Sequence, residues 1–265
     1  MIHIIGAELW GGSFPTDKLR LPCRPTHFYV DTHKMPDKEQ CNIYLQVEPN
    51  AIVNNRDHIL MHAPKYKYIL TFDKSLLHLP NAKKYIANAT WITKEDAESI
   101  HLEQKKFQLS SLTGAKASTA GHRFRIEVLK KSSDFTIPSI FFRSNIPPMT
   151  SKCSDKIHLF REFQFSLVIE NSRQDNYFSE KLCDCLYTKT IPIYYGAPNI
   201  TEYFDTSGWI ILENESVDEL LAKISILDNT WYQRHLDTVL QNYTTVLQYL
   251  TIEGNFNRVL DTLDY

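Results

Sequence analysis

The sequence of 265 residues lacks a long hydrophobic run, and no stretch approaches the ~18 uninterrupted apolar residues of a membrane span. Its first residues, Met1-Ile-His-Ile-Ile-Gly, lack the basic region and long apolar core of a secretory signal peptide. It also lacks a basic excess, because 29 Lys and Arg stand against 31 Asp and Glu, which argues against a nucleic-acid binder. We therefore expect a soluble cytoplasmic protein with no membrane span and no nucleic-acid partner.

Cysteine is scarce, and the sequence has no cluster of metal ligands. The five cysteines, at positions 23, 41, 153, 183 and 185, are odd in number and scattered, which favours reduced thiols over a disulfide framework. Cys183 and Cys185 form the one close pair, and no second pair completes a zinc-finger spacing. No Asp-x-Asp motif occurs. The sequence therefore predicts no bound metal and no resident cofactor.

The composition is that of an ordinary globular protein, with 43% hydrophobic and 23% charged residues, which excludes a disordered or collagen-like chain. The length suits one large domain or two modest ones. In the first hundred residues, short β-rich runs alternate with turns, and helical signals are weak. The expected strands there are His3–Ile5, Thr26–Asp31, Asn42–Val47, Tyr68–Phe72 and Thr90–Thr93, with a candidate helix at Pro80–Asn88.

From Lys105 onward, strand and helix patterns alternate along the chain, which predicts a parallel sheet with right-handed crossovers. We place the domains at residues 1–104 and 105–265, and leave open that the C-terminal helix packs back on the first domain. Such sheets bind ligands beyond the carboxyl ends of their strands. The main expected elements are strands Phe107–Ser111, Ser139–Arg143, Phe163–Glu170 and Thr190–Tyr195, and helices His122–Lys131, Tyr177–Tyr187 and Trp231–Leu250.

The densest polar segment follows the expected strand Phe163–Glu170 and leads into a helix near Tyr177. The unpaired amide groups and the dipole at a helix start form an anion site. Lys181 adds a positive charge in the first turn, and Glu180 offers a carboxylate to sugar hydroxyls. No glycine-rich loop is present, so the P-loop and dinucleotide fingerprints are absent. An ordinary polar loop before a capped helix is the alternative interpretation.

A second segment, Thr190-Ile-Pro-Ile-Tyr-Tyr-Gly196, is an apolar strand that ends at the same sheet edge. Together with Glu170-Asn-Ser and the run Asp175-Asn-Tyr-Phe-Ser-Glu-Lys181, it resembles the signature of the α-1,3/1,4-fucosyltransferases, glycosyltransferase family 10. The family pattern is Glu-Asn-Ser, a polar run, Tyr-x-Thr/Ser-Glu-Lys, and then Ile/Val-Pro-x-x-x-Gly. The spacing matches over about fifty residues, and Ser179 stands where Thr is usual.

This resemblance implies a GT-B-like α/β fold, with two Rossmann-like domains that face each other across a cleft. It also implies an inverting, metal-independent transfer of L-fucose from GDP-fucose, held by the second domain, to an oligosaccharide or glycan acceptor. By the family pattern, Lys181 contacts the diphosphate and Glu180 contacts the ribose or the sugar. The other donor-binding residues implied are Glu170, Asn171, Tyr177 and Ser179.

Two looser matches complete the expected site. Gly121-His-Arg123-Phe-Arg125 opens a helix where the family carries an arginine for the donor phosphates, and we do not choose between Arg123 and Arg125. Two solvent-facing arginines are the alternative. Glu48, in Leu45-Gln-Val-Glu-Pro49, resembles the family's general base, which must deprotonate the acceptor hydroxyl. The alternative for Glu48 is a surface carboxylate at a turn.

Two rival functions remain open. In the first, the same site takes another donor, such as UDP- or GDP-linked xylose. In the second, the chain is a non-catalytic module that binds a nucleotide sugar or a glycan. The pair Glu180 and Lys181, together with a base at Glu48, favours the enzyme. Neither the acceptor nor the linkage follows from the motifs.

Overall fold

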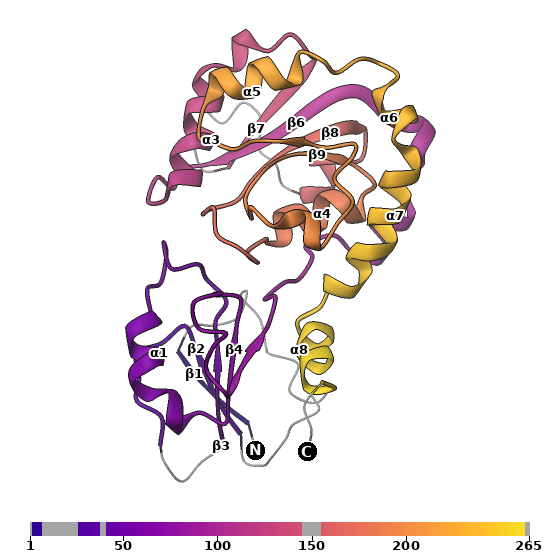
Figure 1. Ribbon diagram of the computed structural model, residues 1–265. Coiled ribbons are helices and arrows are strands. Elements are labelled where there is room, and N and C mark those ends of the chain that lie inside the picture. The colour runs from indigo at the N-terminus through magenta and orange to yellow at the C-terminus, as the bar shows by residue number, and fades with distance from the viewer. Residues whose placement is uncertain (1, 7–25, 38–40, 145–154, 263–265) are drawn as a thin grey trace. The chain divides into compact units, whose positions relative to one another are not determined.

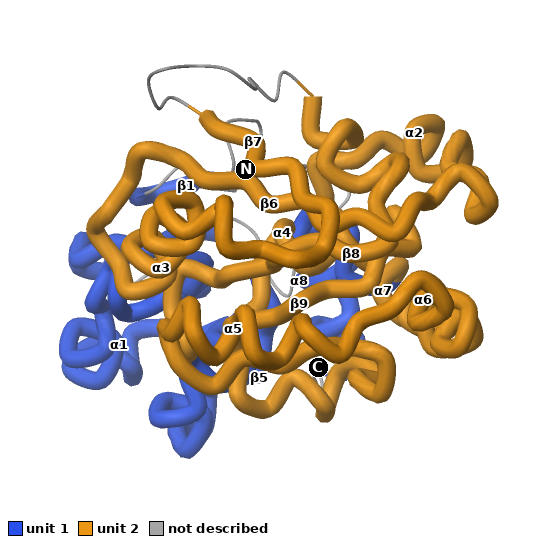
Figure 2. Tube along the Cα trace, turned by 90° about the horizontal axis from the view of Figure 1, so that it is seen from above, with its two compact units in different colours: residues 1–89, 174–177, 248–265 blue, residues 90–173, 178–247 orange. Residues whose placement is uncertain are grey.

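The computed structural model describes residues 2–6, 26–37, 41–144 and 155–262. The chain forms two compact units, each built on its own sheet (Figures 1 and 2). Unit 1 comprises residues 1–89, 174–177 and 248–265, and unit 2 comprises residues 90–173 and 178–247. Both sheets are entirely parallel among the described residues, which agrees with the expectation of two α/β halves.

The sheet of unit 1 follows the order of the chain. Its strands are β1 (Ile2–Gly6), β2 (Thr26–Val30), β3 (Cys41–Leu45), β4 (Tyr68–Thr71) and β5 (Ala82–Lys84). Side chains alternate between the two faces along each strand, as the pleat of a strand requires. Each face therefore needs its own cover.

Two helices supply that cover (Figure 1). On one face, Phe28 and its neighbours pack with Phe256 and Leu260 of α8 (Ile252–Leu260). On the other face, Tyr44 and its neighbours pack with Ile59 of α1 (Arg56–His62). The C-terminal helix thus belongs to the core of unit 1, although more than 220 residues separate it from β2 in the sequence.

The sheet of unit 2 has the order β10-β9-β8-β6-β7. Its strands are β6 (Lys106–Gly114), β7 (Ser139–Ser144), β8 (Phe163–Ile169), β9 (Ile191–Tyr195) and β10 (Ile210–Ile211). After β6 the chain first adds β7 on one side, and then crosses to add β8 on the other side. The strand order therefore reverses between β6 and β8, and such a switch point is where open α/β sheets bind ligands.

Helices lie against this sheet in two groups (Figure 1). The helix α3 (Ala120–Lys130) contacts α5 (Val217–Ile224), and α4 (Glu180–Tyr187) contacts α7 (Leu236–Val246). The expected helix Trp231–Leu250 is divided into α6 (Trp231–Arg234), α7 and a short 3-10 turn. Both α3 and α4 begin just beyond the strands of the switch point.

The segment after Ala89 belongs to unit 2, whereas the sequence prediction placed the domain boundary after residue 104. Asp184 of α4 accepts hydrogen bonds from the Thr90 hydroxyl (2.7 Å) and the Trp91 amide (2.9 Å). Arg161 donates to Ser99 (2.9 Å), which follows α2 (Lys94–Glu98). Side chains of unit 2 therefore hold this segment.

Three local predictions were wrong. Thr90–Thr93 is not a strand, because Thr90 is bound to Asp184 and Thr93 caps α2. Pro80–Asn88 is not a helix, because its residues supply β5 at the edge of the unit 1 sheet. The helix expected from Tyr177 begins only at Glu180, where Ser179 is the N-cap.

Two observations concern the protein's environment. Cys41 is disulfide-bonded, so the expectation of reduced thiols is wrong for this residue, while Cys183 and Cys185 are free and buried. Cys23 and Cys153 lie outside the described residues. Within the described ranges, every helix is too short or too polar to cross a bilayer.

Candidate functional site

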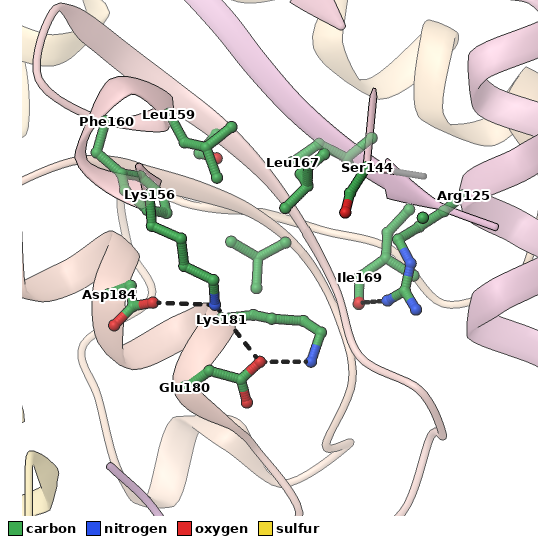
Figure 3. Close-up of a pocket in the computed structure, with 14 residues that line it drawn as sticks. Arg125, Ser144, Lys156, Leu159, Phe160, Leu167, Ile169, Glu180, Lys181 and Asp184 are labelled. Atoms are coloured by element: carbon green, nitrogen blue, oxygen red, sulfur yellow. Dashed lines mark hydrogen bonds and ion pairs between the residues drawn. The ribbon is translucent and has the colours of Figure 1, made fainter. Parts of the chain in front are cut away.

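A cavity of about 230 Å³ lies in unit 2 at the switch point of its sheet (Figure 3). The ends of β6 and β8 form one side of it, and the start of α4 forms another. Its lining residues are Leu112, Gly114, Arg125, Ser144, Lys156, Leu159, Phe160, Ser166, Leu167, Val168, Ile169, Glu180, Lys181 and Asp184. Apolar side chains gather near Leu159 and Phe160, and charged side chains gather around Glu180 (Figure 3). This combination suits a ligand with an apolar part and an anionic part.

Glu170, the first residue after β8, is completely buried. Its carboxylate accepts hydrogen bonds from the Ser179 amide (2.8 Å) and the Ser179 hydroxyl (2.6 Å). Burial raises the pKa of Glu170, and the opposing charge of Lys181, 4.0 Å away, counteracts that rise. Glu170 thus holds the N-cap residue of α4 in place, and it does not line the cavity.

The amide groups at the start of α4 are partly occupied by the protein itself. Glu170 accepts from the Ser179 amide, and the Ser179 hydroxyl accepts from the Lys181 amide (3.4 Å). The expectation that free amides at this helix start bind a pyrophosphate is therefore wrong for these two groups. Attraction for an anion must come mainly from the side chains that surround the cavity, with a smaller contribution from the helix dipole.

Lys181 and Glu180 form an ion pair inside the cavity, with 3.0 Å between Nζ and Oε1 (Figure 3). Burial opposes the charge of Lys181, but Glu180 and Glu170 outweigh it and raise the pKa of Lys181. Burial likewise opposes the charge of Glu180, but Lys181 and Lys156 lower its pKa to about 2. Both side chains are therefore charged at neutral pH.

Arg125 joins this group from α3 (Figure 3). Its guanidinium donates to the Ile169 carbonyl and to Oδ1 of Asn171 (2.8 Å). Gly121, one turn earlier, makes this approach possible, because a Cβ there would lie 1.8 Å from the Glu170 carbonyl oxygen. Arg123 does not line the cavity, and it donates instead to two carbonyls of the loop before α3. Of the two candidate arginines, the structure brings only Arg125 to the cavity.

The pKa of His122 is affected by burial and by the positive charge of this region. Its pKa is lowered to about 4, first by burial and then by nearby cations that include Arg125 and Lys181. The imidazole is therefore neutral at physiological pH. It lies within hydrogen-bond distance of the Thr119 hydroxyl (2.9 Å), and together they cap the start of α3.

The structure places Tyr177 and Glu48 in unit 1. Tyr177 is buried and packs on Phe72, with 5.3 Å between the ring centroids. It does not line the cavity described above. Glu48 follows β3, and its amide donates to the Asp31 carboxylate at the end of β2 (2.8 Å).

Asp31 lies at the carboxyl end of β2, beside Glu48, and was not among the predicted site residues. Its carboxylate also accepts from the Val47 amide (3.1 Å), so it fixes the backbone on which Glu48 is mounted. Burial is the main cause that raises the pKa of Asp31, to about 7, and the charge of Glu48 adds to it. Asp31 ends the expected strand Thr26–Asp31, and parallel neighbours bring their carboxyl ends together. The sequence could therefore have placed Asp31 close to Glu48.

Lys156 and Asp184 were also missed. Asp184 lies four residues after Glu180, so the spacing on a predicted helix could have placed both carboxylates on one face. Lys156 belongs to a 3-10 turn (Lys156–Leu159) that no sequence pattern indicated. Ser144, at the end of β7, lines the cavity and was likewise not anticipated.

A parallel α/β fold with a cationic cavity at its switch point is typical of enzymes that bind phosphorylated ligands. A family model for glycosyltransferase family 10 (fucosyltransferase), C-terminal part, matches residues 117–250, which is half of the chain. The chain belongs to this family. The matched range contains the segments on which the resemblance was noted, from Glu170 to Gly196.

Curated relatives support the same family. The chain is 28% identical over 89 residues to the alpha-(1,3)-fucosyltransferase FucT of Helicobacter pylori, which covers 33% of this chain and 18% of the relative. It is 22% identical over 243 residues to GDP-fucose protein O-fucosyltransferase 3 of Xenopus laevis. This alignment covers 86% of this chain and 49% of the relative. The aligned part thus spans less than half of either relative.

Solved structures show the same fold. An alpha1,3-fucosyltransferase matches with a TM-score of 0.52 and 14% identity, over 86% of this chain and 79% of the other. Anabaena Alr3699/HepE, in complex with UDP and glucose, matches with a TM-score of 0.57 and 9% identity, over 84% and 71%. These neighbours are GT-B glycosyltransferases, which confirms the predicted fold class.

Because the pKa of Asp31 is raised to about 7, its ionisation should destabilise unit 1. The stabilising contribution of the raised pKa is complete below the ordinary value near 4 and is lost as pH rises through about 7. We expect the free energy of unfolding of the wild type to fall between pH 4 and 7 relative to Asp31→Asn. Urea unfolding at several pH values measures this difference.

The exposed Asp57 in the same unit offers a control. Asp57→Asn should follow the wild type across the pH range. Parallel curves for the wild type and Asp31→Asn would contradict the raised pKa of Asp31.

Proposed function

We propose that this chain is an inverting, metal-independent glycosyltransferase that moves L-fucose from GDP-fucose to a carbohydrate hydroxyl. Membership of the fucosyltransferase family supports the reaction class. The observation that carries the assignment of a nucleoside diphosphate donor is the cavity at the switch point, which Lys181, Arg125 and Glu180 line (Figure 3). The choice of GDP-fucose rests on the family.

The charges of the cavity suit a nucleoside diphosphate. In the transfer, the bond between the sugar's anomeric carbon and the diphosphate breaks, and negative charge grows on the departing phosphate. Lys181 and Arg125 are fixed by neighbouring groups, so they can stabilise that charge with little reorganisation. In this proposal the two side chains serve the leaving group in place of a bound metal ion.

Inversion requires the acceptor hydroxyl to attack the face of the sugar opposite the leaving diphosphate. A base must then accept the hydroxyl proton. We assign this role to Glu48, whose backbone is held by Asp31. Tyr177 and Asn171 stay proposed donor-site residues on the family pattern, and Asn171 also positions Arg125.

The acceptor has two candidate classes. A carbohydrate hydroxyl agrees with the likeness to alpha-(1,3)-fucosyltransferase FucT. A protein hydroxyl agrees with the likeness to GDP-fucose protein O-fucosyltransferase 3, which covers 86% of this chain. Transfer to a glycan and to a folded protein domain, measured in parallel with labelled GDP-fucose, separates the two.

Two further proposals concern the donor and the location of the protein. Another donor, such as UDP- or GDP-linked xylose, would bind the same cations through its diphosphate, and its other contacts with the apolar part of the cavity would differ. A cytoplasmic location was predicted, but the disulfide at Cys41 favours an oxidising compartment.

Replacement of Lys181 tests the donor site. We expect Lys181→Ala to weaken GDP binding by about 10-fold to 100-fold, as loss of a charged hydrogen bond does. Lys181→Arg keeps the charge and should bind GDP more tightly than Lys181→Ala. Calorimetry against GDP, UDP and the corresponding nucleotide sugars measures both effects and also names the donor.

Lys130 is the matched control, since it lies on α3 and pairs with Glu127 outside the cavity. Lys130→Ala should bind GDP like the wild type. Unchanged GDP affinity in Lys181→Ala would show that Lys181 does not bind the nucleotide. Binding of no nucleotide by the wild type would overturn the proposed function itself.

Replacement of Glu48 tests the general base. Glu48→Gln should leave GDP-fucose binding intact and lower turnover by ~10²-fold or more, which is the usual contribution of such a base. Initial rates at saturating donor give the comparison. Glu103→Gln, at an exposed position of unit 2, is the control and should retain full turnover.

Near wild-type turnover in Glu48→Gln would exclude Glu48 as the base. The same assay is run with EDTA in excess. Turnover should persist there, and a rate restored only by added divalent cation would contradict the metal-independent mechanism.

A further inference from the structure

Lys156 is a third cation of the cavity, and neither the motifs nor the family pattern assigned it a role. It lies at the start of a 3-10 turn, and its side chain runs along the cavity wall toward α4 (Figure 3). The Nζ atom lies 3.7 Å from Oε1 of Glu180 and 3.4 Å from Oδ2 of Asp184. It also lies 5.3 Å from the centre of the Trp91 ring.

Two carboxylates on one face of α4 hold this ammonium group. Glu180 and Asp184 are four residues apart, and Lys156 bridges them. Asp184 is tied down from its other side by Thr90 and Trp91. Lys156 therefore rests against a fixed support, while its own side chain is 30% exposed and can be reached from the cavity.

Lys156 and Lys181 contact the same oxygen atom, Oε1 of Glu180. Two ammonium groups that share one carboxylate oxygen are close enough to share one phosphate group. Among the described residues, the charged side chains that line the cavity are the cations Arg125, Lys156 and Lys181 and the carboxylates Glu180 and Asp184. Two adjacent ammonium groups that can both be reached from the cavity favour an anionic ligand beside Lys156 and Lys181.

We propose that Lys156 binds the diphosphate of the donor together with Lys181, and that Glu180 and Asp184 hold it in place before the donor arrives. This proposal rests on the proposed function, because it requires a nucleoside diphosphate in the cavity. When the donor binds, a phosphate oxygen replaces Oε1 of Glu180 as a partner of the Lys156 ammonium group. Oε1 of Glu180 then accepts a hydrogen bond from a hydroxyl of the donor. The flexible stem of lysine allows this exchange without movement of α4.

The test must avoid leaving buried Asp184 without its cation, because that alone would destabilise the fold. Asp184→Asn is therefore the reference variant, and Lys156→Met with Asp184→Asn is the test variant. An asparagine at position 184 can still accept the hydrogen bonds of Thr90 and Trp91. Calorimetry measures the affinity of both variants for GDP and for guanosine, which lacks phosphate, and thermal unfolding confirms that both are folded.

We expect the test variant to bind GDP about tenfold or more weakly than the reference, with equal affinity for guanosine. Lys156→Arg with Asp184→Asn should recover GDP affinity. Equal GDP affinity in the test and reference variants would overturn the proposal, and so would an equal loss for GDP and guanosine, since that pattern indicates a purely structural role. If the wild type and the reference bind no GDP, the proposed function fails as well, and the two failures are thus distinguished.

Discussion

The buried carboxylate of Glu170 is the constraint on which the candidate site depends. It lies where β8 ends, and it binds both the amide and the hydroxyl of Ser179, the residue that caps α4. A buried charge of this kind is costly unless it is compensated. The compensation comes from Ser179 and from Lys181, 4.0 Å away, so that Lys181 is directed toward the cavity by the same group that fixes the helix.

Close contacts around Glu170 extend this constraint to the neighbouring elements. Gly121 lets the start of α3 touch the Glu170 backbone, and this contact brings Arg125 to Ile169 and Asn171. Gly196, after β9, is also closely packed, because a Cβ there would lie 2.2 Å from the Tyr194 hydroxyl oxygen and 2.8 Å from the Glu170 side chain. The ends of β8 and β9 and the starts of α3 and α4 therefore meet around Glu170, and a substitution at Gly121 would disturb Arg125 as well as the packing.

Much of the second unit could be predicted from its sequence. The apolar run of β8, the polar segment after it and the strand ending at Gly196 follow rules of local pattern, and they carried the family resemblance. The start of α4 was misplaced by three residues, because Tyr177 and Phe178 have helical spacing but pack elsewhere. Ser179 also has an extended backbone, with φ −122° and ψ −173°, so the helix begins only after it.

Other features depend on contacts between distant parts of the chain, which pattern cannot supply. The use of Glu170 as an internal acceptor for the helix start, in place of a ligand, was not foreseeable from spacing. The same holds for Lys156, whose partners lie 24 and 28 residues further along the chain. Unit 1 was harder still, since its edge strand β5 is short and polar, and its sheet is covered by the C-terminal helix.

The central claim is that the cations at the start of α4 bind the diphosphate of a nucleotide sugar. A crystal structure of the chain with GDP tests it most directly. The account predicts phosphate oxygens within ~3 Å of Lys181 Nζ, which is the range of a charged hydrogen bond, with the nucleoside in the same cavity. GDP bound elsewhere, with Lys181 still paired to Glu180 and Glu170 and to no phosphate, would contradict it.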